Sequence, residues 1–271
     1  MSRIASIQMT SGPEVAANLA IAGRLLEEAA AQGALLAGLP ENFSIMGRSE
    51  ADKLAASEPD GDGPIQEFLA AHARRLKLWI IGGTIPVRAG NDGRVAAASL
   101  LYDADGRRRA RYDKIHLFDV KVPDKAEEYR ESATIVHGRE PVVIDTPAGR
   151  LGMAVCYDVR FPELFRRMSA SGAEIFSLPS AFTAPTGRAH WETLLRARAI
   201  ENLCYVMAPA QAGMHANGRE TYGDTMIVDF WGRVLSRLPR GAGVVTATLD
   251  REKQAEVRRS FPALEHRILE S

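Results

Sequence analysis

The sequence of 271 residues has few cysteines, no excess of charge of either sign and no long apolar run. The two cysteines, Cys156 and Cys204, give no sign of a disulfide scaffold. Lys plus Arg and Asp plus Glu each number 34, so net charge does not argue for binding to nucleic acid or an anionic membrane. No stretch approaches the roughly 18 apolar residues of a membrane span, and the N-terminus lacks the apolar run of a signal peptide. We therefore expect a cytoplasmic protein with free thiols.

What the sequence does contain is an alternation of strand-like and helix-like segments along its whole length. Apolar residues make up 46% and charged residues 25%, as in soluble globular proteins. The length suits one α/β domain with a large core, and no linker or repeat divides it. We therefore expect a single domain over residues 1–271, built as a sheet sandwich with helices outside.

Hydrophobic periodicity locates the individual elements. Helices are predicted at residues 14–31, 65–76, 161–171, 190–202 and 251–259. Strands are predicted at residues 4–9, 34–39, 78–85, 96–103, 173–178, 203–208 and 244–249. Two further pairs, 142–145 with 151–155 and 226–230 with 233–237, read as hairpins, which favours mixed rather than purely parallel sheets.

Three separate segments place reactive side chains where chemistry is favoured. Cys156 ends an apolar strand and precedes a helix, at the kind of strand end where open α/β sheets carry their sites. Glu41 follows another buried strand, where partial desolvation is expected to raise its pKa toward that of a general base. Lys114, placed near a thiol, is expected to lower the cysteine pKa and to stabilise an oxyanion. Each of the three, taken alone, also fits an ordinary core or surface position.

Taken together, these segments resemble the nitrilase superfamily of carbon–nitrogen hydrolases. The matching stretches are LPEN (39–42), YDKIHLFD (112–119) and GMAVCYDVRFPEL (152–164). The resemblance covers nearly the whole chain and keeps the family's order of Glu, Lys and Cys. It implies a four-layer α-β-β-α sandwich of two mixed sheets, a Glu41–Lys114–Cys156 triad, no metal or organic cofactor, and at least a homodimer.

Further motifs resemble the branch of deaminated glutathione amidases and ω-amidases, with the former closer. They are SAFT (180–183), TGRAHWE (186–192), LRARAIEN (195–202) and YGDTMIVD (222–229). Asp224 and Phe230 depart from the His and Pro usual in that branch, which leaves the precise substrate open. The resemblance implies an amidase acting on a small carboxylate-bearing amide, deaminated glutathione first, with ω-amidase, nitrilase or carbamoylase activity as alternatives.

The family's second glutamate corresponds to Glu131, although Glu127 and Glu128 lie close enough for an alignment slip. The expected reaction is acyl transfer through a Cys156 thioester, with release of ammonia or an amine and then attack by water. Glu41 is the base, and Glu131 orients the water, the amide or the lysine. The backbone N–H of Tyr157 and the Lys114 ammonium are expected to hold the oxyanion.

A carboxylate on the substrate requires a cation, and Arg160 is the first candidate because Arg binds carboxylates bidentately. Thr183, Thr186 and His190 are weaker candidates, and Arg160 could equally form an ion pair with Asp158 or Glu163. Cys204 reads as a core residue. Two other functions stay open: a thiol protease with His116 as its base, and a catalytically idle scaffold.

Overall fold

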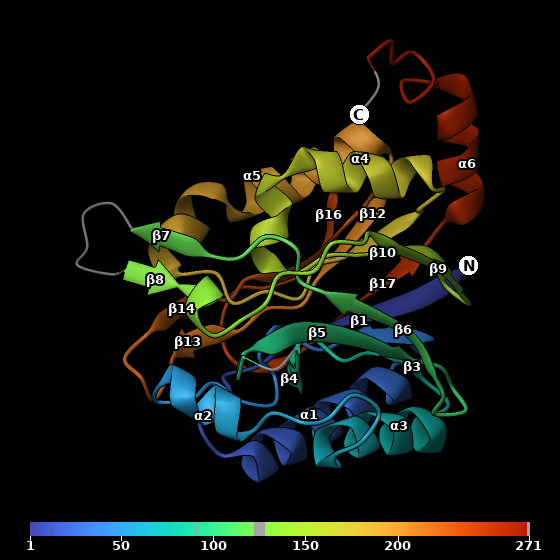
Figure 1. Cartoon of the computed structure of the whole chain (residues 1–271). Helices are drawn as coiled ribbons and strands as arrows, with labels where there is room; N and C mark the ends of the chain where they lie inside the picture. Colours follow the sequence, from blue (N-terminus) through green and yellow to red (C-terminus); the bar gives the residue numbers. More distant parts are fainter. Residues whose placement is uncertain (90–91, 122–127, 270–271) are drawn as a thin grey trace.

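The polypeptide forms two β-sheets packed face to face, with helices covering their outer faces (Figure 1). The structure, a computed structural model, describes residues 1–89, 92–121 and 128–269. The helices α1 and α3 lie on the outer face of one sheet, and α4 and α5 on the outer face of the other. The expected α-β-β-α sandwich is therefore confirmed.

The first sheet has the strand order β17-β1-β2-β3-β5-β4, with β6 paired to β5. Its strands are β1 (Ser2–Gln8), β2 (Leu36–Gly38), β3 (Trp79–Ile81), β4 (Ile85–Arg88), β5 (Val95–Tyr102), β6 (Arg108–Asp113) and β17 (Gly243–Leu249). The strand β1 runs antiparallel to β17 and parallel to β2, so this sheet is mixed.

The second sheet has the order β16-β15-β12-β11-β10-β9. Its strands are β9 (Val142–Thr146), β10 (Gly149–Met153), β11 (Ile175–Ser177), β12 (Tyr205–Ala208), β15 (Thr225–Val228) and β16 (Val234–Leu238). Strands β10, β11 and β12 are parallel, whereas β9 and β15 pair antiparallel to their neighbours. Both predicted hairpins are present, β9–β10 and β15–β16.

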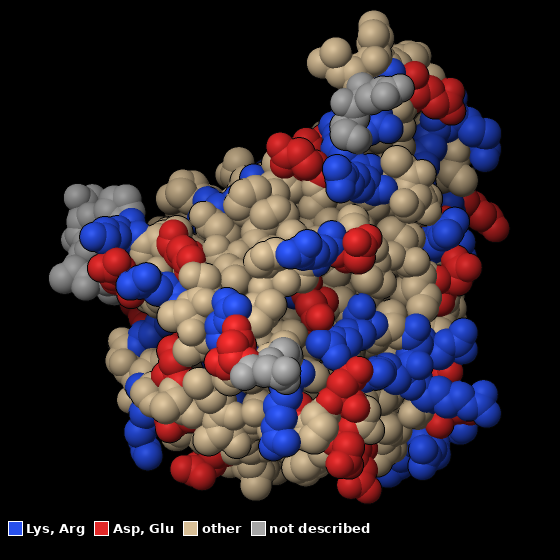
Figure 2. Space-filling model, viewed as in Figure 1, with Lys and Arg blue, Asp and Glu red and all other residues tan. Residues whose placement is uncertain are grey.

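The helices are α1 (Val15–Ala31), α2 (Glu50–Ala55), α3 (Pro64–Leu76), α4 (Pro162–Ala170), α5 (Ala184–Asn202) and α6 (Arg251–Ser260). Two 3₁₀ turns, η1 (Glu131–Ala133) and η2 (Cys156–Arg160), carry site residues. Among the described residues, no helix is both long and apolar enough to cross a membrane. Basic and acidic side chains are interspersed over the visible surface (Figure 2).

Alternate side chains of β1 enter two different cores, because successive residues of a strand face opposite sides. Ile4 belongs to the core between the sheets, together with Met153 of β10 and Met207 of β12. Ile7 belongs to the outer core beneath α1, together with Leu26. The apolar core between the sheets thus holds strands of both sheets against each other.

The segment 78–85, predicted as one strand, is two strands separated by a turn at Gly82 and Gly83. Gly83 has a φ of +50°, and a Cβ at this position would lie 2.0 Å from the carbonyl oxygen of Pro40. Only glycine allows so close an approach. This contact fixes the chain immediately before Glu41.

One helix starts earlier than predicted, and several short elements were not predicted. Helix α5 begins at Ala184, six residues before the predicted start, with Pro185 in its first turn. Helix α2 and strand β6 are rich in charged residues and lack a strong apolar period. Two small two-stranded sheets are also too short to show an apolar period. They are β7 (Asp119–Lys121) with β8 (Glu128–Arg130), and β13 (Ala212–Met214) with β14 (Glu220–Tyr222).

Candidate active site

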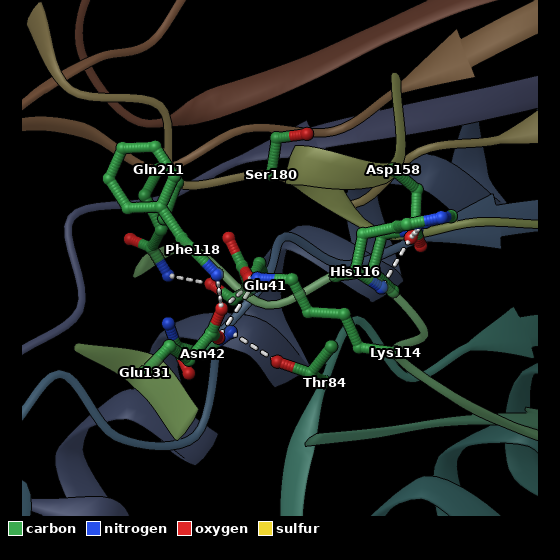
Figure 3. Close-up of polar contacts among 12 residues, drawn as sticks. Glu41, Asn42, Thr84, Lys114, His116, Phe118, Glu131, Asp158, Ser180 and Gln211 are labelled. Carbon is green, nitrogen blue, oxygen red and sulfur yellow. Dashed lines mark hydrogen bonds and ion pairs between the residues drawn. The ribbon is translucent and has the colours of Figure 1, made fainter. Parts of the chain in front are cut away.

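Four side chains from separate segments meet in one pocket where strands of the two sheets end. Glu41 follows β2, Lys114 follows β6, Glu131 opens η1 and Cys156 follows β10. Figure 3 shows the Lys114 side chain extending toward the carboxylates of Glu41 and Glu131. The segments that follow β2 and β6 of the first sheet and β10 of the second sheet converge at this pocket, and η1 joins them there.

Lys114 is the centre of the charge network. Its Nζ lies 2.8 Å from Oε1 of Glu41 and 2.9 and 2.8 Å from the two carboxylate oxygens of Glu131. Its side chain is only 2% exposed. Burial disfavours the charge, but the carboxylates of Glu131 and Glu41 outweigh it and raise the pKa of Lys114 well above its usual value. The ammonium is therefore firmly charged.

Glu41 is held on both its backbone and its side chain. Its carbonyl oxygen accepts a hydrogen bond from Nε2 of Gln211 at 3.1 Å, and the next backbone N–H, of Asn42, donates to Oγ1 of Thr84 at 2.9 Å (Figure 3). Burial acts to raise the pKa of Glu41, as expected, but the charge and hydrogen bond of Lys114 outweigh it. The net pKa is lowered, so the expectation of a raised value was wrong.

Cys156 occupies a strained position at the end of β10. Its φ is +47°, in the region that non-glycine residues seldom adopt, and its backbone N–H donates to the carbonyl oxygen of Pro179 at 2.9 Å. The thiol is hydrogen-bonded to the Glu41 carboxylate and receives the backbone N–H of Ala181. This conformation directs the sulfur into the pocket beside the charge network.

The thiol of Cys156 does not have the low pKa that its proximity to lysine led us to expect. Burial and the negative charge of Glu41 raise the pKa of Cys156 above its usual range, while Lys114 acts in the opposite direction. The resting cysteine is therefore a thiol hydrogen-bonded to a carboxylate. Such a pair can attack an acyl carbon if Glu41 takes the proton as the new bond forms.

A buried carboxylate supports the turn that carries Cys156. Oδ2 of Asp158 accepts hydrogen bonds from the hydroxyl of Tyr112 at 2.7 Å and from the N–H of Val155 at 2.8 Å. Its Oδ1 accepts from the backbone N–H of His116 at 3.0 Å and lies 2.7 Å from Nδ1 of the same residue (Figure 3). The His116 ring also stacks on Phe161. His116 thus supports the turn, which argues against its role as a thiol-protease base.

The structure places Glu131, rather than Glu128, against Lys114. Besides contacting the ammonium, Oε2 of Glu131 accepts the backbone N–H of Phe118 at 2.7 Å. Glu128 lies on β8 with its carboxylate 3.7 Å from Nζ of Lys121. Glu127, the other alternative, lies outside the described residues.

The pocket has a volume of about 170 Å³. Of the predicted substrate-binding residues, Tyr157, Arg160, Thr183 and Thr186 line it. His190 is not among the described lining residues, and its Nδ1 instead lies 3.2 Å from Nη1 of Arg160.

The guanidinium of Arg160 lies 5.3 Å from the ring centre of Phe182 and 5.8 Å from that of Tyr157. Asp158 is occupied by the contacts above, and among the described residues Arg160 forms no ion pair. The alternative of a structural ion pair with Asp158 or Glu163 is therefore not what the structure shows. Cys204 is buried, with its sulfur 3.2 Å from the carbonyl oxygen of Ala173, as expected of a core residue.

Several pocket residues were not predicted from the sequence, chiefly Glu50 and Lys53 of α2 and Arg219 of the loop between β13 and β14. Charged side chains in a short polar helix or in a loop carry no strong periodic signal, so only the fold shows that they face the site. In the described ranges, no group of three His, Cys, Asp or Glu side chains is arranged as metal ligands.

The chain is similar to known proteins over nearly its whole length. The model of the carbon–nitrogen hydrolase family matches residues 3–259. A deaminated glutathione amidase of Synechocystis sp. is 43% identical over 267 residues, covering 97% of each chain. The human deaminated glutathione amidase is 41% identical over 268 residues, covering 97% of this chain and 81% of its own. The crystal structure of Saccharomyces cerevisiae Nit3, of the nitrilase superfamily, superposes with a TM-score of 0.88 at 30% identity, over 99% of this chain and 97% of its own.

Proposed function

The chain belongs to the carbon–nitrogen hydrolase family, and we propose that it hydrolyses deaminated glutathione through a covalent thioester on Cys156. It is an amidohydrolase, as its family and its amidase relatives indicate. The observation that carries the proposed mechanism is the buried ammonium of Lys114 between Glu41 and Glu131, in the same pocket as the thiol.

The first half-reaction forms the thioester. The sulfur of Cys156 attacks the amide carbon while Glu41, already hydrogen-bonded to the thiol, accepts its proton. The carbonyl oxygen becomes an oxyanion, for which the Lys114 ammonium and the N–H of Tyr157 are the proposed donors. Loss of one such donor typically costs about 2.7–4 kcal/mol of transition-state stabilisation. Glu41 then passes the proton to the nitrogen, the C–N bond breaks and the amine leaves.

The second half-reaction regenerates the thiol. Glu41 takes a proton from a water molecule as its oxygen attacks the thioester carbon, and the C–S bond then breaks. The sulfur regains its proton through Glu41, and the carboxylic acid product departs. Glu131, bonded to Lys114 through both carboxylate oxygens, holds the ammonium in place during both steps.

The substrate proposal depends on a cation that faces the pocket. Deaminated glutathione carries an α-keto acid carboxylate on the acyl side of the scissile amide, and Arg160 is the proposed partner of that carboxylate. Its guanidinium lies over Phe182 and Tyr157 rather than in an ion pair among the described residues, so its donors other than the Nη1 group near His190 remain available to a ligand. Thr183 and Thr186 supply hydroxyl groups on the same wall.

The test is a side-by-side assay of purified enzyme on deaminated glutathione, an ω-amide of an α-keto acid, an aliphatic nitrile and an N-carbamoyl amino acid. We expect the highest kcat/KM on deaminated glutathione, with release of the amine. Preference for the ω-amide, the nitrile or the carbamoyl compound would replace this substrate with one of the other family activities. A protein that turns over none of them would fit an idle scaffold.

Two properties of the molecule bear on where and how it works. Both cysteines are free thiols, and the proposed mechanism needs a reduced Cys156, so we place the enzyme in the cytoplasm.

Trp231 and Phe261 form an exposed aromatic pair, each 53% exposed, and Ile200 is 49% exposed. Exposed apolar groups of this kind are common at subunit contacts, and we propose a homodimer, which sedimentation equilibrium would test.

A further inference from the structure

A second guanidinium, that of Arg219, faces the same pocket from the loop between β13 and β14. Arg219 lies just before β14, and its guanidinium carbon is 5.1 Å from the ring centre of Tyr129. Its Nη2 donates to the carbonyl oxygen of Ala181. These two contacts fix the plane of the guanidinium at the pocket wall.

Arg219 is also close to the reacting groups. Ala181, whose carbonyl oxygen it holds, gives its own N–H to the Cys156 sulfur. The charge of Arg219 contributes to the lowered pKa of Glu41, after the larger effects of burial and Lys114. A ligand bound to this guanidinium would therefore lie beside the scissile bond.

Among the described residues, the lining arginines at positions 130, 160 and 219 form no ion pair, and only Arg160 and Arg219 of these are partly buried. Each described carboxylate of the lining already has a cation, namely Glu41 and Glu131 with Lys114, Glu50 with Lys53, and Glu128 with Lys121. In the described part of the chain no ion pair involves Arg160 or Arg219. Arg130, the remaining cation of the lining, lies on β8 and is exposed, so solvent screens it.

We infer that Arg219 binds a second carboxylate of the substrate, on the leaving-amine side of the scissile bond, and so selects amides with an anion on each side. The inference rests on the proposed function, in which Arg160 binds the carboxylate on the acyl side. Two partly buried guanidiniums that have no carboxylate partner in the described part of the chain, held over different aromatic rings of one pocket, match a ligand with two carboxylates. Deaminated glutathione has its second carboxylate at the glycine end.

The test compares two substrates that differ only in that group: deaminated glutathione, and the same compound with the glycine carboxylate converted to a primary amide. We expect wild-type kcat/KM to be about 10- to 100-fold higher for the acid, the range of a charge-assisted hydrogen bond. Arg219→Met should remove most of this preference, and Arg219→Lys should retain part of it. Arg160→Met should lower kcat/KM for both substrates. Arg107→Met, at a side chain 76% exposed, is the matched control.

The outcomes separate the inference from the proposed function. Equal wild-type rates on the acid and the amide overturn the role of Arg219, even if its variants fail to fold. An Arg219→Met enzyme that loses the same factor on both substrates also overturns it, because that pattern indicates a structural role through Ala181. A wild-type enzyme that cleaves neither compound but hydrolyses another class of amide rejects the proposed substrate, and the inference with it.

Discussion

Nζ of Lys114 lies 2.8 Å from Oε1 of Glu41, in a pair whose two side chains are 2% and 4% exposed. This single buried contact sets the protonation of the site. It keeps Glu41 ionised despite burial, so that the carboxylate can receive the proton of the neighbouring thiol. Four predictions follow from the contacts of this pair and of the turn that carries Cys156.

Replacing Cys156 with Ala should abolish turnover and leave the fold intact. Without the sulfur no thioester forms, and loss of a catalytic nucleophile typically lowers kcat by about 10³-fold or more. Amine release measures the loss, and mass spectrometry of quenched wild-type enzyme should reveal an acyl group on the peptide containing Cys156. Cys204→Ala is the control: its sulfur is buried away from the pocket, so turnover should persist. Retained activity in Cys156→Ala would reject the covalent mechanism.

Replacing Glu41 with Gln should change turnover and thiol reactivity in opposite directions. Loss of the base lowers kcat by about 10²–10⁴-fold. The Glu41 charge also raises the pKa of Cys156, whereas Lys114 lowers it, so the variant should have more thiolate at pH 8.

Alkylation by iodoacetamide, followed by mass spectrometry of each cysteine peptide, measures the thiol reactivity of this variant. Cys204 serves as an internal reference, because burial raises its pKa to about 12. Slower alkylation of Cys156 in the variant would contradict the charge assignment.

Replacing Lys114 with Met should destabilise the protein by about 3–5 kcal/mol near pH 8, because a buried carboxylate loses its cation. In the wild type the pKa of Glu41 is lower in the folded protein than in the unfolded one, which stabilises the fold at any pH above the unfolded-state pKa. This stabilisation is lost as the pH falls through the folded-state pKa. In the variant, burial raises the pKa of Glu41, so the protonated form favours folding at low pH. The gap between the two proteins should therefore narrow as pH falls.

Urea unfolding at pH 8 and pH 5 measures that gap. Lys77→Met is the control, because the Lys77 side chain is 69% exposed and its ion pair with Asp105 spans 3.6 Å. It should cost little at either pH. A Lys114→Met deficit that is the same at both pH values would show that lost packing, rather than the uncompensated carboxylate, causes the instability.

Replacing Asp158 with Asn should weaken the turn that presents Cys156. The carboxylate is fully buried and accepts from Tyr112, Val155 and His116. Hydrogen bonds to a charged group contribute about 1.5–3 kcal/mol each, and the amide NH₂ of Asn cannot accept. We expect a loss of stability in that range and a lower kcat. Asp145→Asn, at a side chain 88% exposed, should change neither. Unchanged stability in Asp158→Asn would contradict this account.

The sequence was sufficient for the order of the main elements and, to within two residues, for the ends of the strands that precede Glu41 and Cys156. The predicted strand at residues 151–155 extends two residues beyond the end of β10 at Met153, because Ala154 and Val155 continue the apolar run. The break at Gly83 was missed because it depends on the carbonyl of Pro40, a tertiary contact that no local pattern reveals.

The pKa shifts of the site residues were harder to predict than the places of those residues in the fold. Burial after a strand correctly indicated desolvation of Glu41, but the sign of its pKa shift depends on the distance to Lys114, which is 73 residues away. The same holds for Cys156, whose pKa reflects burial and Glu41 more than the lysine. Arg219 gave no signal at all, since its orientation depends on Ala181 and Tyr129.

The division of the reacting groups between the sheets has a practical consequence. Glu41 and Lys114 follow strands of the first sheet, whereas Cys156 follows a strand of the second. Neither half of the chain can assemble the reaction centre alone. Turnover should therefore report how well the two sheets are docked: a shift of about 1 Å between them should lower kcat about 100-fold while circular dichroism still records intact helices and strands.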